Sequence, residues 1–122
     1  MIPRKDIIGN RVLCLFWKAS KKGASRKLIY IFSKGAFFVP IARSTDILKR
    51  ITASKRVEVK INGNSQACKP KMFDEFALTK QMLKRGAERL AGRKLGLKSK
   101  LMQNLNRMAA KHVVIELKPV KV

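Results

Sequence analysis

Very few side chains in this sequence could carry acid–base or nucleophilic chemistry. The chain holds one histidine, His112, and seven acidic residues. A general acid or base must lie within hydrogen-bond reach of the proton that it moves. Asp74 and Glu75 are adjacent, so on a helix they point in different directions, and the sequence identifies no partner for His112. We therefore expect no enzymatic activity; a Glu58–His112 pair formed in three dimensions would overturn that expectation.

The cysteines do not indicate a metal site. Cys14 and Cys68 are far apart in the sequence, and they are the only cysteines. A structural zinc site needs four nitrogen or sulfur ligands at short spacings. Cys14 lies within the apolar run VLCLFW, which is typical of a small buried hydrophobe. The sequence also lacks a glycine-rich phosphate loop. We expect no metal, no cofactor and no small-molecule substrate, and the redox state of the two cysteines stays open.

Charge is the strongest functional signal in the sequence. The chain has 29 Lys and Arg residues against 7 Asp and Glu, a formal net charge of +22, while 46% of its residues are hydrophobic. Such a chain can build a core, but self-repulsion opposes its compaction unless a polyanion neutralises it. Residues 1–62 hold 15 basic and 3 acidic side chains, and residues 63–122 hold 14 and 4. Charge on both halves favours a protein embedded in nucleic acid.

Two basic segments are candidates for phosphate contact. The segment 18–27, KASKKGASRK, combines cations with small residues that let a backbone approach a phosphate. Arg85, Arg89 and Arg93 recur every fourth residue and would form one stripe on a helix. The predicted nucleic-acid-binding residues are Lys18, Lys21, Lys22, Arg26, Lys27, Arg85, Arg89, Arg93, Lys94, Lys98, Lys100, Arg107 and Lys111.

The segment 90–112, LAGRKLGLKSKLMQNLNRMAAKH, raises the alternative of a DNA-reading helix-turn-helix. Such a helix needs Asn, Gln or Arg at its exposed start, aimed at base edges. The candidates Gln103, Asn104, Asn106 and Arg107 follow the lysines rather than lead the helix. A helix-turn-helix also needs a helical core, whereas half of this chain reads as sheet. We therefore favour backbone binding over base reading.

The elements that must position these residues divide the chain into two halves. β-branched and aromatic runs predict strands, and a capping Ser44 or Thr45 predicts a short helix that ends near Ser54. Val57, Val59 and Ile61 alternate with polar residues up to the Asn62-Gly63 turn signal. The predicted strands of this mainly β half, residues 1–63, are 11–18, 27–33 and 36–42, arranged as an antiparallel meander, and 56–63.

The second half reads as helical. Residues 64–71 read as a linker, 72–112 as a helical hairpin, and 113–122 as a strand and tail. A buried stripe is predicted on the first helix, made of Phe73, Phe76, Leu83, Ala87 and Leu90. The predicted fold is therefore α+β, in a single domain of residues 1–122. It is a small N-terminal antiparallel β-meander with one short helix, followed by a basic C-terminal helical hairpin and a final short strand.

These observations predict a protein that binds the phosphate backbone of nucleic acid. We expect a structural RNA-binding component of a ribonucleoprotein assembly, ribosome-like, with RNA favoured over DNA and neighbouring proteins as further partners. A DNA-binding accessory or regulatory protein, plasmid- or virus-borne and using the 76–112 hairpin, is the alternative, and a virion or nucleoid packaging protein is a further one. The N-terminus lacks the apolar segment of a signal peptide, and no apolar run could span a bilayer. We therefore expect an intracellular location, in the cytoplasm or an organelle matrix, within a nucleoprotein particle.

Overall fold

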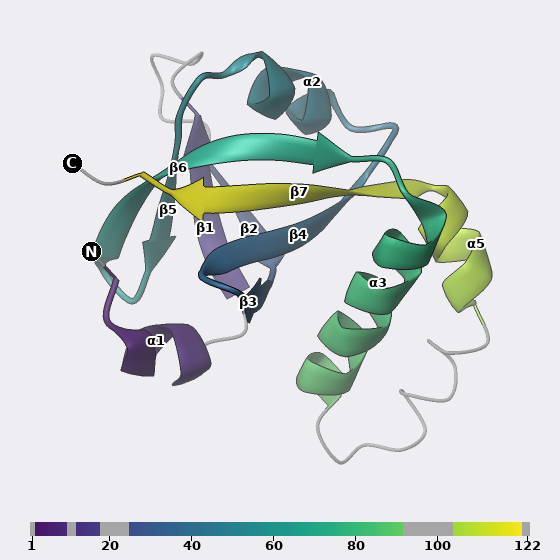
Figure 1. Cartoon of the computed structure of the whole chain (residues 1–122), viewed down its shortest axis with the longest axis horizontal. Helices are drawn as coiled ribbons and strands as arrows, with labels where there is room; N and C mark the ends of the chain where they lie inside the picture. The colour runs from purple at the N-terminus through teal and green to yellow at the C-terminus, as the bar shows by residue number, and fades with distance from the viewer. Residues whose placement is uncertain (1, 10–11, 18–24, 92–103, 121–122) are drawn as a thin grey trace.

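The chain folds around an antiparallel sheet (Figure 1). The computed structural model describes residues 2–9, 12–17, 25–91 and 104–120. Within these residues the sheet has seven strands in the order β2-β1-β5-β6-β7-β4-β3. The elements are α1 (Arg4–Gly9), β1 (Val12–Trp17), β2 (Ser25–Ile29), β3 (Ile31–Ser33), β4 (Ala36–Ala42), α2 (Asp46–Ala53), β5 (Val57–Ile61), β6 (Asn64–Phe73), α3 (Phe76–Ala91), α5 (Leu105–Ala110) and β7 (His112–Pro119).

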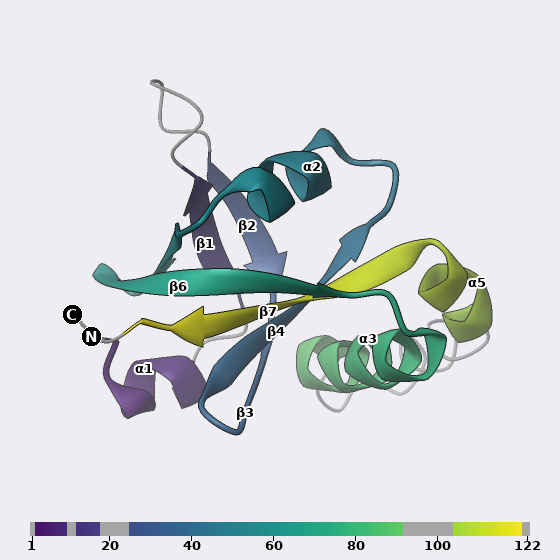
Figure 2. The same ribbon diagram turned by 45° about the horizontal axis from the view of Figure 1, so that its top comes forward.

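The sheet curls into a near-barrel because its two edge strands are consecutive in sequence. β2 pairs with β1 and β3 pairs with β4, and only Tyr30 separates β2 from β3. The bent segment that contains β2 and β3 therefore supplies both edge strands of the sheet and brings the two edges close together (Figures 1 and 2). Curling in this way leaves little open strand edge for unwanted pairing.

Alternation along the strands places apolar side chains inside the barrel. Val57, Val59 and Ile61 are buried, whereas Glu58 and Lys60 between them are exposed. This is the pattern expected for a strand with one covered face. The strand and helix predicted at 56–63 and 44–54 are confirmed, as is the strand at 36–42.

Two tight turns connect neighbouring antiparallel strands. Lys34 and Gly35 have φ angles of 52° and 78°, and Asn62 and Gly63 have 51° and 82°. Two consecutive positive φ angles match the twist of the flanking strands, and they favour Asn-Gly-like pairs. The first turn fixes the β3–β4 hairpin, and the second fixes the β5–β6 hairpin.

Two short helices lie on opposite sides of the barrel (Figures 1 and 2). Ile7 of α1, with Ile2 just before the helix, enters the same hydrophobic cluster as Ile47 and Ile51 of α2. The hydroxyl of Tyr30 donates a hydrogen bond to the carbonyl oxygen of Ile7. This bond ties α1 to the bend between β2 and β3.

The predicted linker and C-terminal helical hairpin are wrong. Residues 64–71 form most of β6, which pairs with β5 and β7. β7 is a central strand between β6 and β4, and α3 lies against the outer face of the sheet with α5 beside it (Figure 2). The fold is mostly antiparallel sheet, nearly barrel-shaped, with short helices around it. The predicted three-strand meander also fails, because the segment 27–33 divides between two sheet edges.

The physical reason is that β6 does not look like a strand locally. Lys69 and Lys71 are exposed, and Pro70 supplies no backbone N–H to a ladder. In sequence such a segment resembles a linker, and only its pairing with β5 and β7 identifies it as a strand. Only Cys68 within it is buried, with its side chain inside the barrel cluster.

The predicted buried stripe on α3 is wrong at the start of the helix. Phe76 is 52% exposed, whereas Thr79 and Met82 are 1% and 5% exposed. Met82 packs with Ile31 and Val114 on the outer face of the sheet. Phe76 therefore lies off the face that α3 turns to the sheet, and Leu83 is half-buried. The side chains of Ala87 and Leu90 lie outside the described part of the structure.

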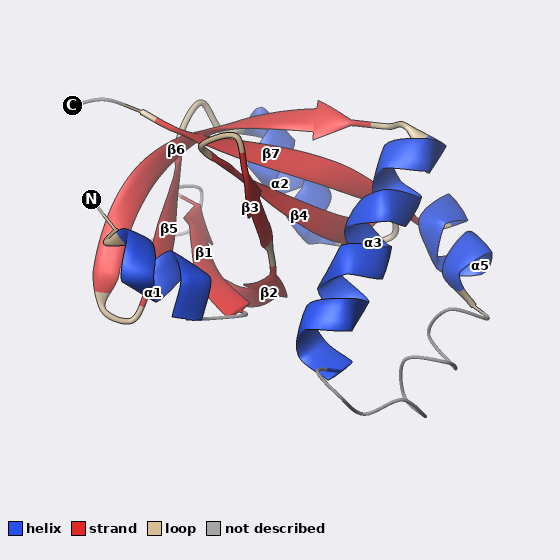
Figure 3. Ribbon diagram, turned by 60° about the horizontal axis from the view of Figure 1, so that its bottom comes forward, coloured by secondary structure: helices blue, strands red, loops and turns tan. Residues whose placement is uncertain are grey.

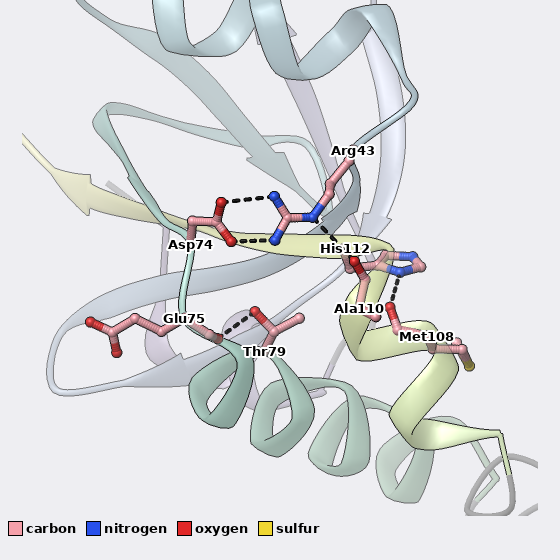
Figure 4. A network of polar contacts seen from close by, with 7 residues as sticks. All are labelled: Arg43, Asp74, Glu75, Thr79, Met108, Ala110 and His112. Atoms are coloured by element: carbon pink, nitrogen blue, oxygen red, sulfur yellow. Dashed lines mark hydrogen bonds and ion pairs between the residues drawn. The ribbon is translucent and has the colours of Figure 1, made fainter.

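One arginine joins three elements at the start of α3 (Figure 4). Arg43 follows β4, and its guanidinium makes a two-pronged ion pair with Asp74, with Nη1 2.7 Å from Oδ2. Its Nε donates to the carbonyl oxygen of Ala110 at 3.2 Å, and its backbone N–H donates to that of Lys111 at 2.8 Å. Thr79 donates to the carbonyl oxygen of Glu75 one turn into the helix.

Candidate functional site

A cleft of about 750 Å³ lies between α1 and the β3–β4 turn. Its size is within the range of small-molecule and cofactor sites, which are mostly apolar with a few polar groups. The walls come from distant parts of the chain. The apolar lining residues are Ile2, Pro3, Ile7, Phe32, Phe37 and Pro119, and the polar ones are Arg4, Ser33, Lys34 and Gln66, with Gly35 in the turn.

Aromatic side chains form a fixed wall of this cleft. The rings of Phe32 and Phe37 have centroids 5.0 Å apart, and Tyr30 meets Phe37 edge to face at 5.6 Å. Phe37 is 1% exposed and Tyr30 is fully buried. Packing of this kind restrains the rings, so the cleft offers a preformed surface to a planar ligand.

Two cations stand at the rim. Arg4 and Lys34 are exposed, and neither forms an ion pair with another described residue. Asp6, the acidic residue of α1, accepts hydrogen bonds from the side-chain amides of Asn62 and Asn64 at 3.2 and 3.0 Å. The carboxylate of Asp6 is therefore engaged at the β5–β6 turn, and the two cations are available to an anionic group.

Gln66 adds one oriented polar group. Its Nε2 donates to the carbonyl oxygens of Ala67 and Val120 at 3.1 and 3.2 Å. These two bonds hold the side chain, and its Oε1 accepts no hydrogen bond from the described residues. An amide oxygen held in this way is an acceptor for a ligand N–H.

None of the described residues that line the cleft is a His, Asp, Glu or Cys. Among the described residues, no group of three His, Cys, Asp or Glu side chains could hold a metal ion. Burial raises the pKa of the Cys68 thiol to about 12, so the thiol stays neutral and unreactive. His112 lies at the α5–β7 junction with Nδ1 2.6 Å from the carbonyl oxygen of Met108. Glu58 is on β5, two strands away from β7, so the Glu58–His112 pair does not form.

The sequence-predicted site residues do not gather at this cleft. Arg26 and Lys27 are exposed on β2, Arg85 on α3, and Arg107 and Lys111 at α5. Outside the described residues lie Lys18, Lys21, Lys22, Arg93, Lys94, Lys98 and Lys100, and the side chain of Arg89 is likewise not described.

Sequence reasoning missed the residues that line the cleft. Arg4, Lys34 and Gln66 are isolated polar residues in three separate elements or turns. The one usable signal was Lys34-Gly35, a turn that presents a cation between two apolar strands. Nothing local connects it with the N-terminal helix.

Comparison with known proteins places the fold. No protein-family model matches the sequence, and no curated protein matches it. Among solved structures, the conserved hypothetical protein Rv2991 from Mycobacterium tuberculosis matches with a TM-score of 0.76 at 11% identity, over 99% of this chain and 82% of that chain. HutZ, a haem storage protein from Vibrio cholerae, matches with a TM-score of 0.66 at 12% identity, over 100% and 93%. An FAD-binding protein from Mesorhizobium loti matches with a TM-score of 0.62 at 15% identity, over 96% and 84%.

Other matching structures are named as a putative pyridoxamine 5′-phosphate oxidase and as general stress protein 26. Identities this low show a shared fold and nothing more. The fold is thus similar to the split barrel of the pyridoxamine-phosphate-oxidase-like proteins. The matching proteins carry names of enzymes, of a storage protein and of an antibiotic resistance protein, so the fold is compatible with catalytic and non-catalytic roles.

These matches correct the predicted function. Several of the matching proteins named here carry small molecules in their names, FAD and haem among them, and none of these names refers to RNA or DNA. The predictions of an RNA-binding ribonucleoprotein component, of its DNA-binding and packaging alternatives, and of no small-molecule substrate are therefore wrong. The error has a physical source, because net charge is a sum over the chain and does not say which cations share a surface. No helix in the described part of the chain is both long and apolar enough to cross a membrane.

Proposed function

We propose that this protein binds a planar organic cofactor with a phosphate group, of the flavin nucleotide class, in the cleft between α1 and the β3–β4 turn. The observation that carries the proposal is the cleft itself, an apolar aromatic pocket with Arg4 and Lys34 at its rim. A flavin nucleotide has the complementary parts, a flat ring system and an anionic tail. The FAD-binding protein that shares the fold supports this choice of ligand.

The chain's residues would bind and orient such a ligand. The ring of Phe32, supported from behind by Phe37, would pack against the ring system, and Oε1 of Gln66 would accept a ring N–H. The two rim cations would bind the phosphate, as Lys and Arg side chains commonly do. A bound flavin would supply electron-transfer chemistry, and the lining side chains would contribute no proton transfer to it. Our proposal is therefore cofactor binding without acid–base catalysis by the described residues that line the cleft.

Haem fits this cleft less well, although one structural match is a haem storage protein. Haem iron is held in proteins by an axial His, Cys, Met or Tyr side chain. None of the residues that line the cleft is of these types. His112 is engaged with Met108 at the α5–β7 junction. The donor set therefore favours a ligand that needs hydrogen bonds and ion pairs but no metal coordination.

Titration with FMN tests the proposal directly. Added protein should quench FMN fluorescence with saturation, and haemin in a parallel titration should bind more weakly. The double variant Arg4→Gln/Lys34→Gln should weaken FMN binding by roughly tenfold or more, since a charge-assisted hydrogen bond contributes about 1.5–3 kcal/mol.

A matched control comes from the other side of the barrel. Lys49 and Arg50 are exposed on α2 and do not line the cleft. The variant Lys49→Gln/Arg50→Gln removes the same charge and should leave FMN affinity unchanged. Equal losses in both double variants would show that FMN responds only to net charge, and the proposal would fail; absence of saturable quenching would also refute it.

A further inference from the structure

A second cleft, of about 520 Å³, lies on the other side of β3. It is bounded by α3 and β3, and Figure 3 shows β3 between α1 and α3. The helix comes close to the sheet at Gly86, where an added Cβ would lie 3.3 Å from Cγ2 of Ile29. Glycine at this position lets the helix backbone approach the bend of the barrel, and Arg85 and Glu88 of the same helix segment line the cleft.

This cleft combines both signs of charge with an apolar floor. Arg85 and Glu88 line it from α3, three residues apart and so on one side of the helix. Both are exposed, and neither forms an ion pair with another described residue. Ile31, which is 6% exposed, and Phe32 supply the apolar part.

The two clefts share a wall. Phe32 and Ser33 line both of them, so one strand separates a ligand in the first cleft from a ligand in the second. Arg85 could bind an anionic group, Glu88 could bind a cationic group, and the floor could pack against a ring between them. A ligand with only one of these charges would leave either Arg85 or Glu88 without a partner.

We propose that the second cleft binds small ring compounds that carry an anionic group at one end and a cationic group at the other. Arg85 pairs with the anion and Glu88 with the cation, while Ile31 and Phe32 contact the ring. The use of this cleft as a substrate site beside the cofactor rests on the proposed function. The proposed ligand class is independent of the proposed function, because the ligand class is argued only from the charges and the apolar floor of the second cleft.

Three probes that share one ring test the charge requirement. These are 4-(aminomethyl)benzoate, which carries both charges, benzoate, which carries only the anion, and benzylamine, which carries only the cation. Isothermal titration should give the highest affinity for 4-(aminomethyl)benzoate. NMR titration should place the largest shifts at the Ile31 methyl groups and the Ser33 amide.

Four single variants separate the site from general attraction to a basic protein. Arg85→Gln should lower the affinity for 4-(aminomethyl)benzoate about tenfold and also weaken benzoate, as expected for loss of a charge-assisted pair. Glu88→Gln should weaken 4-(aminomethyl)benzoate and benzylamine. The exposed neighbours Lys84 and Glu75 provide matched controls, because Lys84→Gln and Glu75→Gln make the same charge changes outside the cleft. Equal losses in the controls, or equal affinity for all three probes, would overturn the inference.

FMN titration of the same variants separates this inference from the proposed function. Arg85→Gln and Glu88→Gln should leave FMN affinity unchanged, since neither residue lines the first cleft. Binding of FMN without any selective probe binding would overturn the inference alone. Charge-selective probe binding without FMN binding would support the ligand class of the second cleft and refute the proposed function.

Discussion

Two regions of the molecule use basic side chains in opposite ways. At the start of α3, the Arg43 guanidinium meets Asp74 and the carbonyl oxygen of Ala110 (Figure 4). At the rim of the first cleft, Arg4 and Lys34 meet no acid among the described residues. The first cation joins three elements of the fold, whereas the other two stand beside an apolar pocket. The presence of an ion-pair partner, and not the number of cations, distinguishes Arg43 from the two cations at the rim.

The environment of Asp74 follows from this difference. The hydrogen bonds from Arg43 hold the pKa of the Asp74 carboxyl below its ordinary value. The same pairing raises the pKa of Arg43. Both side chains are about half exposed, at 46% and 49%, so solvent screens the ion pair and its contribution to stability is small. Its effect is to position the start of α3 rather than to hold the barrel together.

The largest expected loss of stability comes from replacing Phe37, which belongs both to the wall of the first cleft and to the barrel core. Phe37→Ala removes a ring that is 1% exposed and contacts Tyr30 and Phe32. We expect the free energy of unfolding to fall by about 3–5 kcal/mol, from lost burial and the cavity left behind. Urea denaturation measures the change. Phe37→Leu, which keeps most of the apolar volume, should cost clearly less, and equal costs would argue against a close-packed wall.

Alanine in either glycine turn should reduce stability by a smaller amount, and only FMN affinity should distinguish the two turns. Gly35 and Gly63 have φ angles of 78° and 82°, and an added Cβ would meet nothing within 4 Å at either site. Alanine therefore costs only backbone strain, roughly 1–2 kcal/mol per residue, and the two variants should be equally destabilised in urea. FMN affinity should fall in Gly35→Ala alone, because Lys34 adjoins Gly35 at the cleft. A matching fall in Gly63→Ala would remove the special role of the first turn.

The smallest effect is the pH dependence of the Arg43–Asp74 pair. A carboxyl whose pKa is lowered by folding contributes stability above its unfolded pKa, and that contribution disappears as pH falls through the folded value. The difference in Tm between the wild-type chain and Asp74→Asn should therefore be present at neutral pH and vanish in acid, below the ordinary aspartate range. Thermal unfolding followed by circular dichroism measures it. A constant gap at all pH values would contradict the assignment to Asp74.

Local patterns were sufficient to predict several elements. Val57, Val59 and Ile61 alternate with polar residues, and burial of one face of a strand requires that alternation wherever the strand sits. The Asn62-Gly63 turn and the strand at 36–42 were predicted for similarly local reasons. The net charge is also read directly from the sequence. It does not distinguish Arg43, which positions the start of α3, from Arg4 and Lys34, which form no ion pair with another described residue.

Tertiary structure alone decided the strand order and both clefts. The sequence of β6 resembles a linker, and only its pairing with β5 and β7 makes it a strand. The segment 27–33 bends at Tyr30 because its two halves pair at opposite ends of the sheet. The cleft residues Arg4, Lys34 and Gln66 come together through that closure. Strand pairing depends on burying a shared interior, and that interior is made by residues far apart in sequence. No local pattern in the sequence specifies which strands pair. Side-chain types and short periodicities therefore determine the helices and strands, and burial of the common core determines which of them pack together.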